Sequence, residues 1–120
     1  MNTLNKTDLD RAVDVYFDAV RSRSAAAIGA VFDPTAVLVH PAGRFSGREE
    51  IEGFYAENNL TAEQFSVEEL QRCYGPATVA VELVLHLDDI TSRQGDFFEF
   101  DQSGRILRLA IYTGGDGGNG

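Results

Sequence analysis

Three polar side chains occupy positions in this sequence where apolar ones would be expected, and together they could transfer a proton. Tyr16 interrupts an apolar stripe of helical spacing, whereas His40 and Asp96 each share one face of a predicted strand with apolar residues. A phenol donates a hydrogen bond, and a neutral imidazole accepts a proton near pH 7. An inward carboxylate flanked by phenylalanines costs several kcal/mol if it is ionised and unpaired, so Asp96 should be protonated or partnered.

Each of these residues also has a purely structural interpretation. Tyr16 could be a core aromatic residue with its hydroxyl at the edge, and His40 a hydrogen-bonded histidine at the edge of a loop. Asp96 could be a solvated carboxylate at the end of a strand, beside Gly95. The periodicity therefore supplies candidates and does not by itself make them a site.

The first half of the chain predicts three helices and one strand. The first helix follows Thr7 as its cap, and its buried stripe consists of Leu9, Ala12, Val13, Tyr16, Phe17 and Val20. A short helix over 24–32 should end at Asp33-Pro34, because the residue before a proline avoids the helical region. Residues 35–40 alternate as a strand with Ala36, Leu38 and His40 on one face, residues 41–43 form a turn, and 48–58 form the third helix.

The second half predicts a run of strands over 65–74, 78–87, 92–101 and 105–113. Helices followed by a meander of strands favour an α+β fold, a cone-shaped, curved antiparallel (mixed) β-sheet with three helices from the N-terminal half on its concave face. Such a half-open cone has a natural pocket between helices and sheet. We expect residues 1–113 to form one domain and the glycine-rich residues 114–120 a disordered tail.

Several motifs in this order resemble those of the bacterial ketosteroid isomerases, within the broader family that is similar to nuclear transport factor 2 and the SnoaL-type cyclases. The resemblance runs from about Asp8 to Thr113. It rests on Tyr16 followed by Phe32, on His40-Pro41-Ala42-Gly43, on Ser46-Gly47 before Phe54-Tyr55-Ala56, on Asp96-Phe97-Phe98-Glu99-Phe100 and on Ser103-Gly104-Arg105-Ile106.

The resemblance implies a cofactor-independent, metal-free isomerase that moves a double bond (from Δ5 to Δ4) in a 3-ketosteroid or a similar enolisable hydrophobic ketone. Tyr16 and Asp96 match the two hydrogen-bond donors to the substrate oxygen, and Tyr55 matches a tyrosine that supports the first. A carboxylic acid kept neutral by an apolar site is a known feature of this enzyme family. His40 departs from the pattern, because it stands where the family has an aspartate as general base.

The apolar wall of the expected pocket consists of Val20, Leu38, Phe54, Phe65, Val84 and Phe98. The resemblance also implies a homodimer formed through the outer face of the sheet. We expect Val79, Val81, Leu83, Leu85 and Leu87 to carry that contact, because one layer of helices does not obviously cover them.

Two other functions stay open at this point. One is a different enzyme of the same fold, a SnoaL-like polyketide cyclase or an epoxide-opening enzyme, in which Asp88, Asp89 and Arg108 could surround a water. That match is weak, since Asp88 and Asp89 point to opposite faces of a strand. The other is a non-catalytic protein that binds a hydrophobic ligand or a partner.

The composition limits the classes of molecule that this protein is expected to bind. The 120 residues carry 19 acidic and 10 basic side chains, a net charge of −9 that disfavours nucleic acids and anionic membranes. A single cysteine excludes an internal disulfide, and no apolar run has the length of a membrane span or signal peptide. We therefore expect a cytoplasmic protein whose partners are a hydrophobic small molecule and a second copy of itself.

Overall fold

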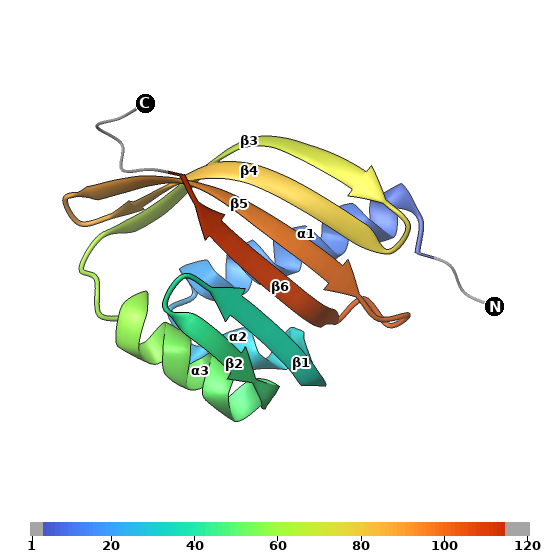
Figure 1. Ribbon diagram of the computed structural model, residues 1–120, viewed down its shortest axis with the longest axis horizontal. Coiled ribbons are helices and arrows are strands. Elements are labelled where there is room, and N and C mark those ends of the chain that lie inside the picture. The colour runs from blue at the N-terminus through green and yellow to red at the C-terminus, as the bar shows by residue number, and fades with distance from the viewer. Residues whose placement is uncertain (1–3, 115–120) are drawn as a thin grey trace.

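A computed structural model describes residues 4–114, which form three helices and a six-stranded mixed sheet (Figure 1). The strand order is β2-β1-β6-β5-β4-β3, with β1 and β6 parallel and every other neighbouring pair antiparallel. The elements are α1 (Lys6–Arg21), α2 (Ala25–Ala30), β1 (Phe32–His40), β2 (Gly43–Ser46), α3 (Gly47–Asn58), β3 (Phe65–Gly75), β4 (Thr78–Leu87), β5 (Ile90–Phe100) and β6 (Ile106–Thr113). The predicted α+β class, with three helices against a curved mixed sheet, is confirmed.

Helix α1 presents the predicted apolar stripe to the sheet, but it begins earlier than expected. Its cap is Asn5 and not Thr7: the Asn5 side chain accepts from the Asp8 backbone N–H at 2.8 Å, and the Asp8 carboxylate accepts from the Asn5 N–H at 3.0 Å. This reciprocal pair satisfies two N–H groups that the first turn leaves open. Tyr16 and Phe17 lie in the middle of the buried stripe.

Helix α2 ends and strand β1 begins before Pro34, earlier in the chain than the sequence predicted. Helix α2 ends at Ala30, because the Val31 carbonyl accepts from the Ile106 N–H at 3.0 Å and Phe32 pairs with Ile106 in β6. The prediction that Asp33-Pro34 ends this helix is therefore wrong. Pro34 lies in an irregular stretch of β1 between Phe32 and Val37, where a missing backbone N–H is tolerated.

Strand β2 was not expected from the sequence. Its four residues pair with β1 from Val37↔Ser46 to His40↔Gly43, so β1, the turn and β2 form a tight hairpin at one edge of the sheet. The segment is too short to show alternation, and only Phe45 is partly buried in it. The hairpin fixes the end of β1, and with it the position of His40.

The residues that were expected to form the dimer contact lie on the opposite face of the sheet, under the helices. Val79, Val81 and Leu83 are almost wholly buried under the helices, so they belong to the core on the concave face and not to an outer contact. Val84 lies on the opposite, convex face with its cross-strand neighbours Glu68 and Arg93. Alternation identifies which residues share a face, but it carries no information about which face the helices cover.

Gly114 donates to the Arg93 carbonyl at 2.8 Å, and residues 115–120 of the predicted tail lie outside the described residues. No helix in residues 4–114 is both long and apolar enough to cross a membrane.

A cluster of charges ties α1 to β3. The Arg72 side chain, only 14% exposed, contacts Asp10 at 3.0 Å and Asp14 at 2.6 Å on α1, and it also pairs with Glu69 on its own strand. These carboxylates hold the pKa of the Arg72 guanidinium above its ordinary value, with Glu69 the largest cause. Because Asp14 lies half a turn before Tyr16, the cluster fixes the helix close to the tyrosine.

Replacing Arg72 should therefore loosen α1 on the sheet. We expect Arg72→Met to lower the free energy of unfolding by about 1–3 kcal/mol, because three carboxylates lose a shared, largely buried partner. Urea unfolding measures this change. Arg11→Met, at an exposed position of the same helix, is the matched control and should change stability by less than about 0.5 kcal/mol. Equal stability of the two variants would contradict the role of the cluster.

Candidate functional site

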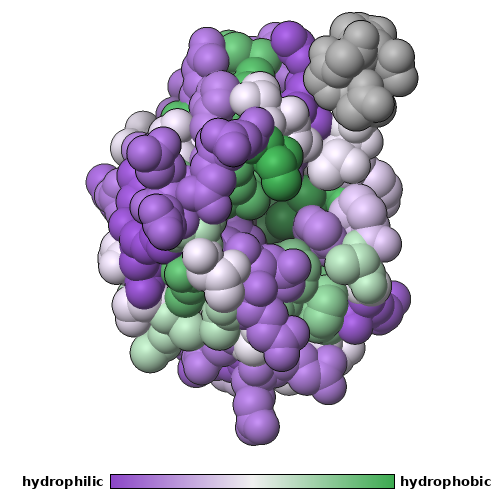
Figure 2. All heavy atoms as spheres, turned by 90° about the vertical axis from the view of Figure 1, so that its left-hand side faces the viewer, coloured by the Kyte–Doolittle hydropathy of each residue, from purple (hydrophilic) through white to green (hydrophobic). Residues whose placement is uncertain are grey.

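A cavity of about 240 Å³ lies between the helices and the concave face of the sheet. Its mouth is at the end of the molecule where α3 leads into β3 and β4 turns into β5 (Figure 1), and Figure 2 shows there an apolar hollow within a hydrophilic rim. The lining residues are Tyr16, Phe17, Val20, His40, Phe54, Tyr55, Asn58, Asn59, Phe65, Val67, Leu83, Leu85, Leu87, Ile90, Ser92, Gln94, Asp96 and Ile111. Most are apolar, so the few polar groups stand out.

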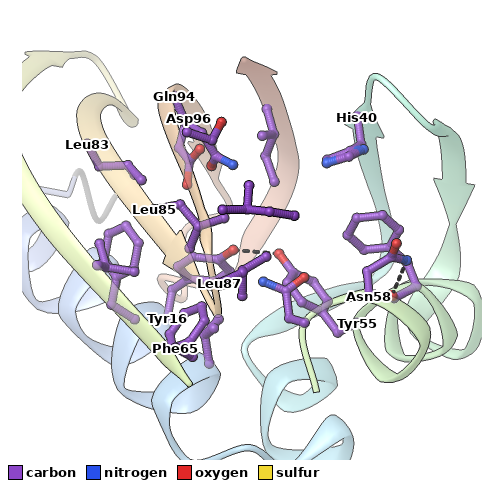
Figure 3. Close-up of a pocket in the computed structure, with 18 residues that line it drawn as sticks. Tyr16, His40, Tyr55, Asn58, Phe65, Leu83, Leu85, Leu87, Gln94 and Asp96 are labelled. Carbon is purple, nitrogen blue, oxygen red and sulfur yellow. Dashed lines mark hydrogen bonds between the residues drawn. The ribbon is translucent and has the colours of Figure 1, made fainter. Parts of the chain in front are cut away.

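Two tyrosines from different helices meet inside the cavity. The Tyr16 hydroxyl on α1 and the Tyr55 hydroxyl on α3 are 2.5 Å apart, and both residues are nearly inaccessible to solvent (Figure 3). Burial is the main cause that raises the pKa of both phenols above the ordinary value of 10.0, and the neighbouring Asp96 charge raises both further. Both hydroxyls therefore remain protonated. One of the two hydroxyl protons forms the hydrogen bond between the tyrosines, so the other hydroxyl proton can be donated to a ligand.

Asp96 is a buried carboxyl group without a hydrogen-bond partner. It is 2% exposed on β5, between its cross-strand neighbours Val81 and Ile111, and its Oδ1 atom is enclosed and makes no hydrogen bond to any described residue. Burial raises the pKa of Asp96 from 3.8 to about 7. The group thus holds its proton well above the usual range, and as an acid it can donate a hydrogen bond.

His40 lies across the cavity from Asp96 (Figure 3). Its ring packs against Phe54 at 4.7 Å between ring centroids, and its Nδ1 accepts from the Ala42 backbone N–H at 3.0 Å. Pro41 has no N–H, so Ala42 is the first residue after the histidine that can donate to it. Partial burial lowers the pKa of His40 from 6.5, so the ring is neutral at pH 7, and the bond from Ala42 directs its proton to Nε2.

The structure brings most of the predicted site residues together. Tyr16, His40, Tyr55 and Asp96 all line this cavity, as do Val20, Phe54 and Phe65 of the expected wall. Leu38 and Phe98 are buried in the core and do not line it. Val84, on the convex face, is a wrong assignment to the wall.

The alternative cluster of two aspartates and an arginine does not form. Arg108 pairs with Glu99 at 3.7 Å, while the Asp88 carboxylate accepts from the backbone N–H groups of Glu63 and Gln64 at 3.0 and 2.9 Å. None of Asp88, Asp89 and Arg108 lines the cavity. Among residues 4–114, no three side chains of His, Cys, Asp or Glu gather closely enough to hold a metal ion.

Sequence reasoning missed four polar lining residues. Ser92 and Gln94 precede Asp96 at two-residue steps on β5, and alternation from Asp96 would have assigned them to the same face. Asn58 and Asn59 end α3, where only tertiary structure turns them toward the mouth; the Asn58 Nδ2 donates to the Phe54 carbonyl at 2.7 Å.

Comparison with known proteins identifies the family. The family model described as a SnoaL-like domain matches residues 3–109, nearly the whole chain. The chain belongs to the SnoaL-like domain family. Among curated proteins, none matches this SnoaL-like chain.

Solved structures support the same fold. A candidate polyketide cyclase from Sinorhizobium meliloti shares 23% identity over 91% of this chain and 100% of its own, with a TM-score of 0.76. SalBIII, an epoxide hydrolase/cyclase-like enzyme of pyran ring formation in the polyether salinomycin, shares 21% over 92% and 93%, with a TM-score of 0.81. A candidate ketosteroid isomerase from Kribbella flavida shares 18% over 91% and 79%, with a TM-score of 0.78. At these identities the likeness concerns the fold, which is NTF2-like as expected.

The raised pKa of Asp96 makes stability depend on pH. In the unfolded chain this carboxyl loses its proton near pH 3.8, whereas the folded protein keeps it until about pH 7. Between these values the folded state binds more protons, so the free energy of unfolding should fall as pH rises and level off above about pH 7. Asp96→Asn should abolish this contribution, which amounts to about 1.4 kcal/mol for each unit of the pKa shift.

Urea unfolding of both proteins across this pH range measures the difference. Asp89→Asn, at an exposed aspartate near the cavity mouth, is the control and should retain the wild-type slope. If Asp96→Asn and wild type lose stability in parallel between pH 4 and 7, the buried carboxyl is not protonated as described.

Proposed function

We propose that this SnoaL-like protein is a cofactor-independent isomerase of the ketosteroid type, which shifts a double bond in a hydrophobic, enolisable ketone by moving a proton between two of its carbons. The observation that carries the proposal is the enclosed, unpartnered carboxyl of Asp96 beside the Tyr16–Tyr55 pair. A buried polar group without a partner is costly, and a substrate oxygen would supply the missing partner.

Two neutral donors in an apolar cavity suit the reaction. Removing a proton from the carbon between the carbonyl and the double bond of a β,γ-unsaturated ketone produces a dienolate. The oxygen of this dienolate gathers negative charge. Tyr16 and protonated Asp96 would hold this oxygen, and their hydrogen bonds strengthen as the charge develops. Because the donors are already oriented and shielded from water, they stabilise the transition state more than the neutral ketone.

His40 would carry the proton from one carbon to the other. Its lowered pKa keeps the ring neutral at pH 7, as a general base requires. Because Nδ1 accepts from the Ala42 N–H, the neutral ring holds its proton on Nε2. Acting as a base toward the cavity therefore requires that this contact opens and that the ring proton moves to Nδ1.

The assay for this proposal is conversion of a β,γ-unsaturated ketone to its conjugated isomer, followed by ultraviolet absorbance. A steroid and a compact two-ring ketone are the two substrates to compare. We expect Tyr16→Phe and Asp96→Leu each to reduce kcat by about 10²–10³, and His40→Ala by about 10²–10⁴. His86→Ala, on the convex face, is the matched histidine control and should leave kcat unchanged.

The pH profile should be narrow. Activity should fall below the ordinary histidine pKa of 6.5 as His40 becomes protonated, and fall again above about pH 7 as Asp96 loses the proton that it donates. Unchanged turnover in His40→Ala would disprove the assigned base. Tight binding of a phenolate analogue without turnover of either ketone would instead indicate a binding protein.

One observation favours a second function, an acid-assisted cyclisation or epoxide opening, and SalBIII is described as an epoxide hydrolase/cyclase-like enzyme. The bond from Ala42 to Nδ1 leaves Nε2–H as the group that His40 can present to a ligand, which is a donor and not a base. Hydrogen-bond donation by Nε2–H needs no rearrangement of the ring, whereas proton transfer requires the imidazolium, whose second proton on Nδ1 would replace the contact with Ala42. The two functions differ in pH dependence, since protonation of His40 below pH 6.5 would accelerate an acid-catalysed opening and stop the isomerisation.

We also propose a homodimer formed through the convex face of the sheet. Phe97 and Tyr112 expose 47% and 54% of their surfaces there and pack edge to face at 5.7 Å, flanked by the Arg93–Glu82 and Arg108–Glu99 ion pairs. Exposed aromatic residues with a polar surround are typical of protein interfaces.

Phe97→Lys should therefore convert a dimer to a monomer of 13.1 kDa in sedimentation velocity at micromolar concentration. Val15→Lys on α1 is the control, because Val15 is as exposed as Phe97 but lies on the other side of the molecule from the convex face. A wild-type protein that sediments only as a monomer would disprove the dimer.

A further inference from the structure

We propose that Gln94 binds a second oxygen of the substrate, so that the substrate is a compact hydrophobic ketone with another hydroxyl or carbonyl about 7 Å from the reacting one. This inference rests on the proposed function, because it takes Asp96 and Tyr16 as the donors to the first oxygen. It concerns what else the substrate must carry, which the reaction itself does not determine.

Asp96 is one end of a polar strip on β5. Ser92, Gln94 and Asp96 follow at two-residue steps, so all three face the cavity, and each lines it. Side chains two residues apart on a strand are separated by about 7 Å. A ligand whose first oxygen lies at Asp96 would therefore have its next hydrogen-bonding group at Gln94, toward the mouth.

The Gln94 side chain has hydrogen-bonding capacity that the protein does not use. It is half-buried, and its amide makes no hydrogen bond to any residue of the described chain, 4–114. Its cross-strand neighbour on β4 is Leu83, and the cavity wall continues with Leu85 and Leu87. A ligand that fills this space displaces water from the amide, so a ligand without a matching oxygen leaves the amide unsatisfied.

Among the other polar groups of the lining, Ser92 lies one two-residue step further from Asp96 than Gln94, and Asn58 and Asn59 lie at the end of α3. Phe65, Val67 and Leu83 form the side of β3 and β4, and the Asn58 amide already donates to the Phe54 carbonyl. An amide both donates and accepts, so Gln94 can bind either a hydroxyl or a carbonyl. The Gln94 position thus selects for oxygen at one point of an otherwise apolar ligand.

The size of the cavity limits the rest of the substrate. Its volume of about 240 Å³ lies below the usual range of about 300–1,000 Å³ for drug-sized ligands. A cavity of this size favours a compact ring system, and a larger ligand would extend through the mouth. The expected substrate class is therefore a small bicyclic or similarly compact oxygenated ketone.

Binding of two unreactive probes tests the inference without depending on turnover. β-Naphthol carries one hydroxyl, which can occupy the site of the enolate oxygen, and a naphthalene diol with one hydroxyl on each ring adds the second oxygen. We expect wild type to bind the diol more tightly than β-naphthol, and Gln94→Met to weaken the diol alone by roughly three- to tenfold. Fluorescence titration measures both dissociation constants.

Two controls separate this inference from the proposed function. Gln71→Met, a glutamine on the convex face, should bind both probes as wild type does. Tyr16→Phe should weaken both probes equally; if it changes neither, the assigned donors are wrong whatever Gln94 does. Equal effects of Gln94→Met on the two probes, no effect on either, or failure of wild type to bind either probe would overturn the proposal for Gln94.

Discussion

The enclosure of the Asp96 carboxyl without a partner is the constraint on which the rest of the site depends. An ionised carboxylate would not be stable between Val81 and Ile111, so the group keeps its proton, and the neutral acid becomes a donor. That state requires a dry environment on every side. The curved sheet provides one wall, the rings of Tyr16 and Phe98 pack edge to face at 5.2 Å beside it, and the helices close the opposite side. For the proposed function, an apolar cavity is therefore a condition for the chemistry as well as the space that would hold the substrate.

Ion pairs and hydrogen bonds at its edges hold this apolar interior in place. The Arg72 cluster fixes α1 before Tyr16, and at the other end of the helix the Arg23 guanidinium donates to the carbonyls of Leu60, at 3.1 Å, and Ala62. Asp88 holds the same segment from the sheet side through Glu63 and Gln64. Arg23 and Asp88 both adopt left-handed backbone conformations, with φ of 61° and 53°, at a cost of about 1–2 kcal/mol each. Backbone strain is thus accepted at two residues that hold the segment 60–64, which joins the cavity-lining residues Asn59 and Phe65.

The sequence predicted the contents of the site better than the surfaces around it. Periodicity placed Tyr16 and Asp96 on inward faces because their neighbours at helical or two-residue spacing are apolar, and that signal is local. The assignment of Val84 to the cavity and of Val79 to the outer face failed for one shared reason: alternation separates the two faces of a strand without stating which one the helices cover. Strand β2 was not predicted because four residues are too few to show an alternation of apolar and polar side chains. Its pairing with β1 is determined by the hairpin. The contact between Ala42 and His40 depends on the turn geometry, which a dipeptide such as His-Pro does not determine.

Burial acts on Asp96 and His40 in opposite directions, and the combination sets the charge of the empty cavity. Their ordinary pKa values, 3.8 and 6.5, would give a carboxylate facing a partly protonated imidazole at neutral pH. Here the pKa of Asp96 is raised to about 7 while that of His40 is lowered, so the carboxyl becomes the weaker acid of the two and the proton stays on Asp96. With both tyrosines also protonated, the cavity carries no formal charge between the lowered pKa of His40 and about pH 7. A neutral hydrophobic ligand can then enter without separating an ion pair, and charge arises only when a proton moves. In the proposed isomerisation, the donors and the imidazole would therefore act mainly on the transition state, which is the condition for catalysis by differential binding.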